Sequence, residues 1–547
     1  MTKTDDPRER RFYNAAADFI DINVARGLGA KGAFIDPSRE LNYADLQTAT
    51  YRFAHAMRAL GLRQESRIVL LLLDTVEFPI AFWGAIRAGI VPIPLNNLLA
   101  TAQYAYILND CRAEAILISA PLFQILEPVL ADLVYLKHVI VVGSETKDLP
   151  APADAFEALL AGASAEPIDV PTVSDEVAFW LYSSGSTGDP KGVKHVQTCL
   201  IATGRLFGQE VLGIGVDDVV FSAGKLFFAY GLANSMAFPM SVGATTVLVP
   251  EPATPQKVIE TMRKYNPTVF FGGPALYAAM LAHNEIGPGA GSNRLVRCVS
   301  GGDILPASVS ERWRAAVGVD IVEGAGASEI LTFLSNRPDD LRYGTPGKPL
   351  PGYDAKLLDT DGEEVGAGTV GELVVRGPTS AEGYWNQRAR SHRTFVGEWV
   401  HTGDTYLRDS DGFYHFFGRN DDMFKVGGVW VSPLILESAL AAHDSVAAVA
   451  VIGCKDNDEM LKPKAFVVLK KGYEEGPDLV RTLRAHVREH LVSRYAQVSS
   501  QSFYAYYPRW IEFRSALPMT ATGKIQRYKL REEDVAAAIA ERDRNSL

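Results

Sequence analysis

The 547-residue chain is 47% hydrophobic and 22% charged, values typical of a globular protein with room for two to four domains, which excludes extensive disorder. Its 54 Lys and Arg against 65 Asp and Glu give a formal charge of -11. A chain this acidic gains no general electrostatic attraction to DNA or RNA, so we expect no nucleic-acid partner.

The N-terminal residues and the most apolar stretch do not predict targeting to or through a membrane. The first twenty residues lack the apolar segment of a signal peptide. The stretch IVLLLLDTVEFPIAFWGAIRAGIVPIPL is interrupted by Asp74, Glu77 and Arg87, which is typical of a protein core. The four cysteines are far apart and form no CxxC pair, which disfavours a zinc site or a disulfide framework. We therefore expect a cytoplasmic protein with no membrane partner.

The first 300 residues alternate helical and strand patterns. DLQTATYRFAHAMRAL has helical spacing, and IVLLLL and AEAILIS are short apolar runs typical of buried parallel strands. The runs VVFSA, GATTVLVP, TVFFGGP and RLVRCVSGGD continue this pattern, and several end in glycines. The alternation predicts a layered α/β region with ligands at the strand ends.

The pattern changes after about residue 340. KPLPGYDAKLLDTDGEEVGAGTVGELVVRG has strands separated by Gly and Asp turns, which predicts a small β-subdomain. Beyond residue 433, ILESALAAH predicts a helix, VAAVAVIG and KAFVVLK predict paired strands, and DLVRTLRAHVREHL predicts a second helix. We expect these last elements to form a compact C-terminal domain.

The segment YSSGSTGDPKGV, residues 182–193 and called the Gly/Ser segment below, follows the apolar run VAFWL. It is not a Walker A motif, because Pro190 stands where that motif needs its second glycine, and no serine in it has the GxSxG pattern. Small residues still let backbone N–H groups and hydroxyls surround a phosphate, and Lys191 adds a positive charge. Taken alone, the segment fits either a phosphate-binding loop or an exposed linker.

Six motifs resemble, in order, the signature segments of the adenylate-forming superfamily of acyl-CoA synthetases, luciferases and peptide-synthetase adenylation domains. They are FWGAIRAGIVPIPLN, the Gly/Ser segment, GAGASE, HTGD, GRNDDMFKVGG and TATGKIQR. The resemblance covers about residues 30 to 535. It implies a large multi-layer α/β domain with a β-subdomain (residues 1–420) and a small mobile α+β domain (residues 421–547). It also implies ATP, Mg²⁺ and coenzyme A as ligands.

The resemblance assigns ATP to the Gly/Ser segment, GAGASE and HTGD. Glu329 is the implied magnesium ligand, with Ser328 beside it at the α-phosphate, although Glu329 alone would equally suit the start of a helix. Asp404 is the implied ribose ligand, although HTGD alone would suit a turn. The nucleotide contacts implied in this way are Ser183, Ser184, Gly185, Ser186, Thr187, Gly188, Lys191, Gly302, Asp303, Glu323, Gly324, Ala325, Ser328, Asp404, Arg419 and Lys524.

The resemblance makes Lys524 a catalytic residue, together with Lys191 and Glu329. Carboxylate attack on a phosphate brings two anions together, so a lysine delivered at that moment stabilises the transition state selectively. Asp421 is the implied hinge, and Gly427 and Gly428 are the implied CoA contacts. Without the surrounding motifs, the sequence would suggest only exposed charged side chains for Lys524 and Asp421 and turn positions for Gly427 and Gly428. We assign His195 no chemical role, because a structural histidine fits its position equally well.

Three further segments resemble the benzoate-CoA ligase branch: FFAYGLANSMAFPMSVGATTVLVPE, the segment that follows CVSGGDILP, and SEILTFLSNRPDDLRYGTPGKPLPGY. They imply a pocket for an aromatic acid, although apolar residues at strand ends are more often core. Gly301 stands where the branch tends to have Ala, and SEILTFLSN is one residue shorter than the branch pattern and lacks its histidine, which suggests room for a ring substituent. The implied pocket residues are Ala229, Tyr230, Gly301, Gly326, Ile330 and Leu331.

We therefore expect an AMP-forming acid–thiol ligase that converts benzoate or a simply substituted benzoate into its CoA thioester through an acyl-adenylate, in the catabolism of aromatic compounds. The alternatives are a hydroxybenzoate, aminobenzoate or cinnamate ligase, transfer to a carrier-protein thiol, and a sensor of aromatic acids without catalysis. A homodimer is compatible with the resemblance. The segment 491–507 is longer than the usual pattern, and we assign it no consequence.

Overall fold

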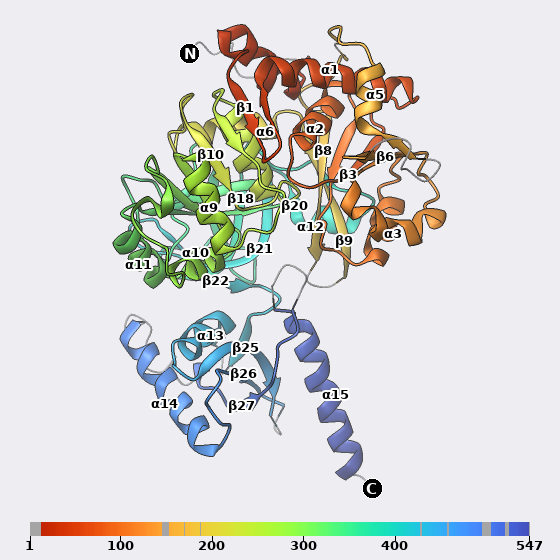
Figure 1. The fold of residues 1–547 in the computed structure, drawn as a ribbon. Coiled ribbons are helices and arrows are strands. Elements are labelled where there is room, and N and C mark those ends of the chain that lie inside the picture. The colour runs from red at the N-terminus through yellow and green to blue at the C-terminus, as the bar shows by residue number, and fades with distance from the viewer. Residues whose placement is uncertain are drawn as a thin grey trace.

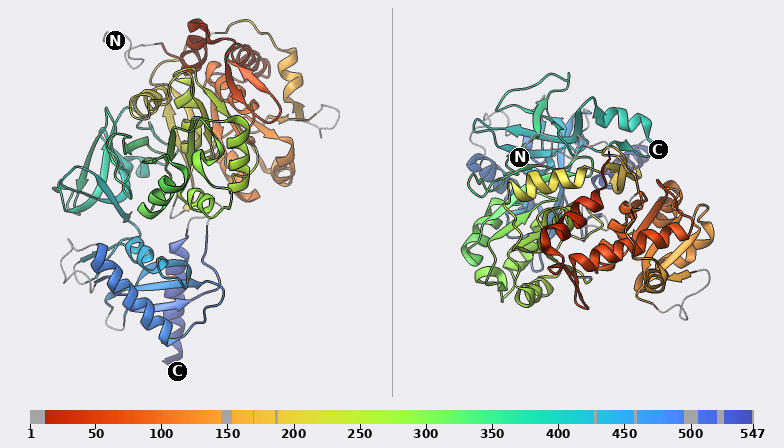
Figure 2. Two further views of the ribbon diagram at one scale, coloured as in Figure 1. Left: turned by 60° about the vertical axis from the view of Figure 1, so that its left-hand side comes forward. Right: turned by 90° about the horizontal axis from the view of Figure 1, so that it is seen from above.

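The computed structural model describes residues 12–144, 153–168, 170–185, 188–426, 429–456, 459–494, 505–519 and 525–545. Figure 1 shows a large body that contains the nine-stranded sheet and both five-stranded sheets and, below it, a smaller body in blue that contains the last elements of the chain. The left-hand view of Figure 2 shows the same separation. The predicted α/β fold is confirmed.

The largest sheet has nine strands in the order β16-β15-β14-β13-β12-β10-β11-β1-β2. The central strands from β14 to β1 are parallel, and β2, β15 and β16 are antiparallel to their neighbours. Four apolar runs predicted to be strands form β10 to β13, which are almost wholly buried. The strands are β1 Gly32–Ile35, β2 Glu40–Asn42, β10 Val219–Ser222, β11 Thr245–Val247, β12 Val269–Gly272, β13 Arg297–Ser300, β14 Ile321–Ala327, β15 Leu331–Ser335 and β16 Lys348–Pro349.

A second sheet has five parallel strands in the order β4-β3-β5-β6-β7. The predicted strands IVLLLL and AEAILIS form β3 and β5, and all five residues of β5 are buried. Strands buried on both faces need apolar residues at every position, which explains these unbroken runs. The strands are β3 Arg67–Leu71, β4 Val91–Pro94, β5 Ala115–Ser119, β6 His138–Val142 and β7 Ala153–Ala155.

Helices connect the parallel strands, and their ends have identifiable capping residues. Helix α1 (Tyr43–Ala59) begins where the side chain of Asn42 accepts a hydrogen bond from the Asp45 N–H. Helix α11 (Ala307–Val317) ends at Gly318, which has a φ of 84°. The other helices of the large body are α2 Glu77–Arg87, α3 Thr101–Asp110, α4 Phe123–Leu126, α5 Phe156–Gly162, α6 Cys199–Thr203, α7 Ala229–Leu232, α8 Phe238–Met240, α9 Pro255–Tyr265, α10 Pro274–Leu281 and α12 Arg388–Thr394. Short 3-10 or π turns cover Ala17–Asp21, Val24–Leu28, Ala120–Leu122, Glu127–Asp132, Gly204–Gln209, Ala233–Ala237 and Pro288–Gly291.

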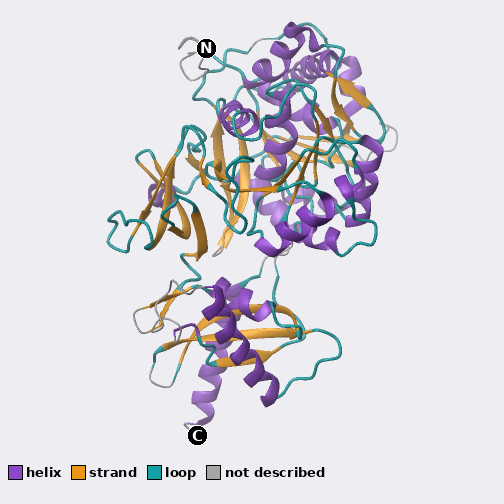
Figure 3. Cartoon of the chain, turned by 90° about the vertical axis from the view of Figure 1, so that its left-hand side faces the viewer, coloured by secondary structure: helices purple, strands orange, loops and turns teal. Residues whose placement is uncertain are grey.

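The predicted β-subdomain is a five-stranded antiparallel sheet, shown in orange in Figure 3 beside the helical layers. Beyond the stretch predicted as strands, the short basic segment RARSHRT forms helix α12 and connects β19 (Gly383–Tyr384) to this sheet. The strands are β17 Asp354–Leu358, β18 Val370–Arg376, β20 Phe395–Val396, β21 Trp399–Arg408 and β22 Tyr414–Arg419.

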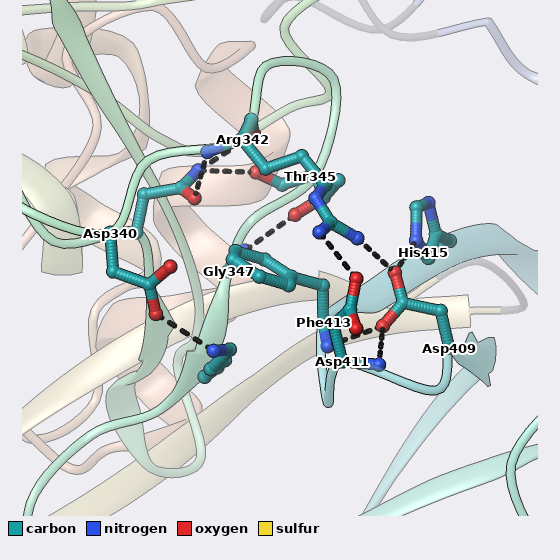
Figure 4. A network of polar contacts seen from close by, with 10 residues as sticks. Asp340, Arg342, Thr345, Gly347, Asp409, Asp411, Phe413 and His415 are labelled. Atoms are coloured by element: carbon teal, nitrogen blue, oxygen red, sulfur yellow. Dashed lines mark hydrogen bonds and ion pairs between the residues drawn. The ribbon is translucent and has the colours of Figure 1, made fainter.

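A network of hydrogen bonds and ion pairs connects this subdomain to the edge of the largest sheet (Figure 4). Arg342 forms ion pairs with Asp409 (2.6 Å) and Asp411 (2.7 Å), which lie in the turn between β21 and β22. The Arg342 guanidinium also lies 4.1 Å from the ring centroid of Phe413, and His415 contacts Asp409 at 2.8 Å. These contacts join the β21–β22 turn to the segment that connects β15 and β16.

The smaller body confirms the predicted helices and paired strands. Strands β25 (Val446–Lys455) and β26 (Leu461–Leu469) pair antiparallel, and β27 (Trp510–Phe513) joins β26 in parallel. The other elements are β23 Phe424–Val426, β24 Val429–Val431, α13 Pro433–Ala441, α14 Pro477–Arg494 and α15 Arg527–Asn545. Residues 495–504 of the longer segment lie outside the described part of the chain.

All four cysteines are buried and free. A helix with the length and apolarity needed to cross a membrane is absent from the described residues.

Candidate active site

The Gly/Ser segment forms most of a β-hairpin, whereas its sequence suggested an open loop. Strands β8 (Val177–Gly185) and β9 (Gly188–Val196) pair with each other, and Ser183 lies opposite Lys191. Gly192 leaves room for the Tyr182 ring, since a Cβ there would lie 3.2 Å from that ring. Ser186 and Thr187 lie outside the described residues. Lys191 is therefore held on a strand, and not on a free loop.

Lys191 and Glu329 meet at the centre of the site. The Lys191 Nζ lies 2.8 Å from the Glu329 Oε1, and each side chain is only about 15% exposed (16% and 15%). The hydroxyl of Tyr384 contacts both, since it accepts from Lys191 (2.8 Å) and donates to Glu329 (2.9 Å). Burial opposes ionisation of Glu329, but the charge of Lys191 and these hydrogen bonds outweigh it and lower the pKa of Glu329. The carboxylate is therefore ionised.

His195 supports the turn that carries Ser328 and Glu329. Its Nε2 donates to the Ser328 carbonyl at 2.7 Å, and its ring stacks on Phe179 with 4.9 Å between the ring centroids. Burial lowers the pKa of His195 to about 4, so the imidazole is neutral and its Nε2–H is the donor. The structure thus gives His195 a structural contact with the site.

Asp404 and Arg419 lie opposite each other in neighbouring strands. The register of β21 and β22 pairs these residues, and the Arg419 guanidinium lies 3.0 Å from the Asp404 carboxylate. Asp404 raises the pKa of Arg419 above its ordinary value, and the charge of Glu329 adds to this effect. Two residues predicted from separate motifs therefore form a pair that faces the same site as Glu329.

Glu323 is the third residue of β14, and its Oε1 accepts from the Leu305 N–H at 3.0 Å. Its Oε2 is buried and has no hydrogen-bond partner among the described residues. Burial, with a contribution from the charge of Asp303, raises the pKa of Glu323 to about 8. Gly302 and Asp303 are exposed beside it, and Gly324, Ala325 and Ser328 are half-buried.

We predict that Glu323→Gln removes a pH dependence of stability. The folded protein holds the Glu323 proton more tightly than the unfolded chain, so wild-type stability falls as the pH rises from about 4.5 to about 8. Gln has no proton to lose, so the variant should gain up to about 1.4 kcal/mol per pH unit relative to wild type across this range. Melting temperatures of both proteins from pH 5 to 8 test this, with Glu260→Gln as the control because Glu260 is exposed on α9. Parallel curves for Glu323→Gln and wild type would contradict the prediction.

Tyr230 and Gly301, two of the residues predicted to contact the acid, lie against each other. The Tyr230 hydroxyl donates to the Val299 carbonyl (3.0 Å) and lies 3.2 Å from the Gly272 carbonyl. A Cβ on Gly301 would lie 2.9 Å from the Tyr230 Cε2. The ring of Tyr230 therefore fills the place of an alanine methyl, and Gly301 adds no room for a ring substituent at this point.

The other predicted pocket residues differ in exposure. Ala229 is half-buried and Gly326 is exposed, whereas the side chains of Ile330 and Leu331 are buried at 0% and 3%. A Cβ on Gly326 would lie 2.7 Å from the Leu331 carbonyl, so the turn between β14 and β15 requires glycine.

The hinge candidate Asp421 is exposed in the turn between β22 and β23. Its neighbour Asp422 forms ion pairs with Arg531 (2.9 Å) and Arg527 (3.4 Å), and Arg527 also pairs with Glu437 at 2.6 Å. Ion pairs therefore connect helix α15, which begins at Arg527, to the hinge segment. Lys524, Gly427 and Gly428 lie outside the described residues.

A magnesium ion fits Glu329 as a protein ligand. The described residues contain no group of three or more His, Cys, Asp and Glu side chains that could hold a metal ion. Mg²⁺ in nucleotide sites takes one or two carboxylates and completes its shell with phosphate oxygens and water. The ionised and partly exposed carboxylate of Glu329 meets this requirement.

Tyr384 was not among the residues predicted from the sequence, although it touches two of them. The only local signal was the aromatic pair in AEGYWNQ, which is equally typical of core residues. Tyr384 reaches Lys191 because β19 pairs with β9, although the two residues are 193 positions apart in the sequence.

Comparisons with known proteins agree along nearly the whole chain. The AMP-binding enzyme family matches residues 23–385, and the AMP-binding enzyme C-terminal domain matches residues 436–524. The benzoate–CoA ligase of Thauera aromatica is 47% identical over 522 residues, which cover 95% of this chain and 96% of that protein. The 4-hydroxybenzoate–CoA/benzoate–CoA ligase of Rhodopseudomonas palustris is 47% identical over 523 residues, which cover 95% and 94%. A solved anthranilate CoA ligase in complex with anthranoyl-AMP superposes with a TM-score of 0.86 at 36% identity, covering 98% of this chain and 100% of that one.

Proposed function

Because the chain belongs to the AMP-binding enzyme family, we propose that it is an AMP-forming ligase that joins benzoate, or a simple ring-substituted benzoate, to coenzyme A. The reaction consumes the acid, ATP and CoA and yields aroyl-CoA, AMP and diphosphate. The observation that carries the proposal is the 47% identity to a benzoate–CoA ligase over 95% of the chain. The names of the other relatives, which include 4-hydroxybenzoate and anthranilate, support substituted benzoates as further substrates.

In the first half-reaction, a carboxylate oxygen of the acid bonds to the α-phosphorus of ATP, and the bond from that phosphorus to the bridging oxygen of diphosphate breaks. Lys191 and Lys524 are proposed to stabilise the negative charge at the phosphates. Mg²⁺, when bound, adds positive charge at the phosphate oxygens, and Glu329 is its proposed ligand. The small residues proposed to surround the β- and γ-phosphates are Ser183, Ser184, Gly185, Ser186, Thr187 and Gly188.

The nucleoside is proposed to lie between β14 and the β21–β22 hairpin. The pair of Asp404 and Arg419 supports this position, because Asp404 keeps carboxylate oxygens available for ribose hydroxyls while Arg419 neutralises its charge. Ser328 lies next to Glu329 and is proposed to contact the α-phosphate. The residues proposed to surround the adenine are Gly302, Asp303, Glu323, Gly324 and Ala325.

In the second half-reaction, the CoA thiolate attacks the acyl carbon, and the bond from that carbon to the AMP oxygen breaks. Free thiols have a pKa of about 8.5, so enough thiolate is present near neutral pH without a protein base. We propose residues 421–547 as a mobile domain that turns about Asp421, with Gly427 and Gly428 beside the pantetheine. The ion pairs between α15 and Asp422 support this mobile domain, because the Lys524 segment and the hinge would then move as one unit.

The aromatic ring of the acid is proposed to lie against Tyr230. Tyr230 is half-buried, and its hydroxyl lies within hydrogen-bond distance of two backbone carbonyls, which supports the ring as a fixed apolar surface for the acid. The other proposed contacts are Ala229, Gly301, Gly326, Ile330 and Leu331.

We predict that Gly301→Ala changes the acid preference. The added methyl would meet Tyr230 Cε2 at 2.9 Å and push the ring toward the pocket. A change of one methyl in a pocket is worth about 1–3 kcal/mol, so kcat/KM for ring-substituted acids should fall about tenfold or more relative to benzoate. Steady-state kinetics on benzoate, 4-hydroxybenzoate and 2-aminobenzoate measure this, and the KM for ATP serves as the internal control. Equal loss for all three acids would contradict the prediction.

Exchange of labelled diphosphate into ATP with a panel of aromatic acids tests the function, followed by thioester formation with CoA. We expect both activities with benzoate. The absence of exchange with every acid would overturn the proposal and favour a sensor. Exchange without a thioester would favour another acceptor, such as a carrier-protein thiol.

We also propose a cytoplasmic enzyme of aromatic-compound catabolism, with no nucleic-acid or membrane partner. The four free cysteines favour a reducing compartment. A homodimer is proposed from the resemblance alone, and size-exclusion chromatography with light scattering tests it.

A further inference from the structure

The hydroxyl of Tyr384 lies between the two charged residues at the centre of the site. Its oxygen accepts from the Lys191 Nζ at 2.8 Å, and its single proton is donated to the Glu329 Oε1 at 2.9 Å. A third partner, the Thr394 Oγ1, is farther away at 3.3 Å. The Lys191 Nζ also lies 4.3 Å from the centroid of the Tyr384 ring. One side chain therefore restrains Lys191 through both its hydroxyl and its ring.

Tyr384 is itself held in a fixed position. It is 5% exposed and lies in β19, whose pairing with β9 places Tyr384 opposite Val193. Its N–H donates to the Ser391 Oγ at 3.1 Å, and its ring packs edge-on against Phe395 at 5.3 Å. Burial, with the charge of Glu329, raises the pKa of Tyr384 above its ordinary value. The hydroxyl therefore keeps its proton and can donate it in a hydrogen bond.

A lysine side chain loses substantial rotamer entropy when it is held in one conformation. An ion pair alone does not define the orientation of the Lys191 side chain, because the ammonium is a point charge on a flexible chain. When ATP and Mg²⁺ enter, Lys191 and Glu329 must exchange part of their contact with each other for contacts with phosphate and metal. The Tyr384 hydroxyl can keep its hydrogen bonds to both during this exchange, because it carries no charge and needs no desolvation at that moment.

We propose that Tyr384 is a positioning residue, which sets Lys191 and Glu329 at the separation and orientation that MgATP requires. The inference rests on the proposed function and adds to it a residue that touches no substrate. A purely structural tyrosine would instead act through its ring, which packs against Phe395 and lies in a small cluster with Val193 and Ala381.

Tyr384→Phe separates these two roles, because it keeps the ring and removes only the hydroxyl. Hydrogen bonds to charged groups contribute about 1.5–3 kcal/mol, so the variant should raise the Kd for MgATP and the half-saturating Mg²⁺ concentration by about 10- to 100-fold. The KM for the acid, thioester formation from supplied aroyl-AMP and CoA, and the melting temperature should change little. Tyr104→Phe is the matched control, since Tyr104 is also buried and donates to the Asn96 carbonyl at 2.9 Å.

Calorimetric titration with MgATP keeps the test independent of turnover. Wild-type affinity for MgATP in Tyr384→Phe, with an unchanged Mg²⁺ requirement, would overturn the inference. A lowered melting temperature with equal loss of both half-reactions would also overturn it and indicate a packing role. If wild type binds MgATP but exchanges no diphosphate with any acid, the proposed function fails while the effect of Tyr384 on MgATP affinity is still measured.

Discussion

Lys524→Ala should abolish formation of the aroyl-adenylate and leave thioester formation intact. The lysine of TATGKIQR is proposed to neutralise charge at the α-phosphate only while the carboxylate attacks. Loss of one such group costs about 10²–10³ in rate, so diphosphate exchange should fall by at least that factor. Exchange and thioester formation from supplied aroyl-AMP are measured on the same preparation.

The control for this prediction is Lys529→Ala, five residues farther along the chain, because Lys529 is exposed on α15. It should retain both half-reactions. If Lys524→Ala instead slowed both half-reactions equally, its assigned role in adenylation would be wrong and a general effect on the C-terminal body would be indicated.

Glu329→Gln should lower the adenylation rate by about 100-fold or more and raise the Mg²⁺ concentration needed for half the maximal rate. The amide keeps the shape of the side chain but supplies no negative charge for the metal. Lys191 loses its ion-pair partner at 2.8 Å, so the affinity for ATP without Mg²⁺ should stay the same or increase. Diphosphate exchange at increasing Mg²⁺ and titration with ATP in the presence of a chelator measure the two effects.

Glu382→Gln is a suitable control for Glu329→Gln. Glu382 forms an ion pair with Lys194, three residues from Lys191, but its side chain is 48% exposed. Exposed ion pairs contribute little, so this variant should keep the wild-type Mg²⁺ requirement. An unchanged Mg²⁺ requirement in Glu329→Gln as well would exclude Glu329 as the metal ligand.

Much of the fold could be predicted because its strands have a strong local signal. Parallel strands buried on both faces need an apolar residue at every position, and the runs that form β3, β5 and β10 to β13 meet this need. The hairpin of the Gly/Ser segment had no such signal, because small polar residues are equally compatible with a loop and with a tight strand pair.

The sequence by itself determined the fold class, the ordered motifs and the residue types available for chemistry, including Lys191, Glu329, Asp404 and Arg419. Backbone preference and motif spacing are local properties, so they can be read along the chain. Only the tertiary structure decided that Tyr384 joins Lys191 to Glu329 and that the Tyr230 ring fills the space beside Gly301. These contacts join residues more than fifty positions apart, and they depend on strand order and side-chain packing, which no local pattern specifies.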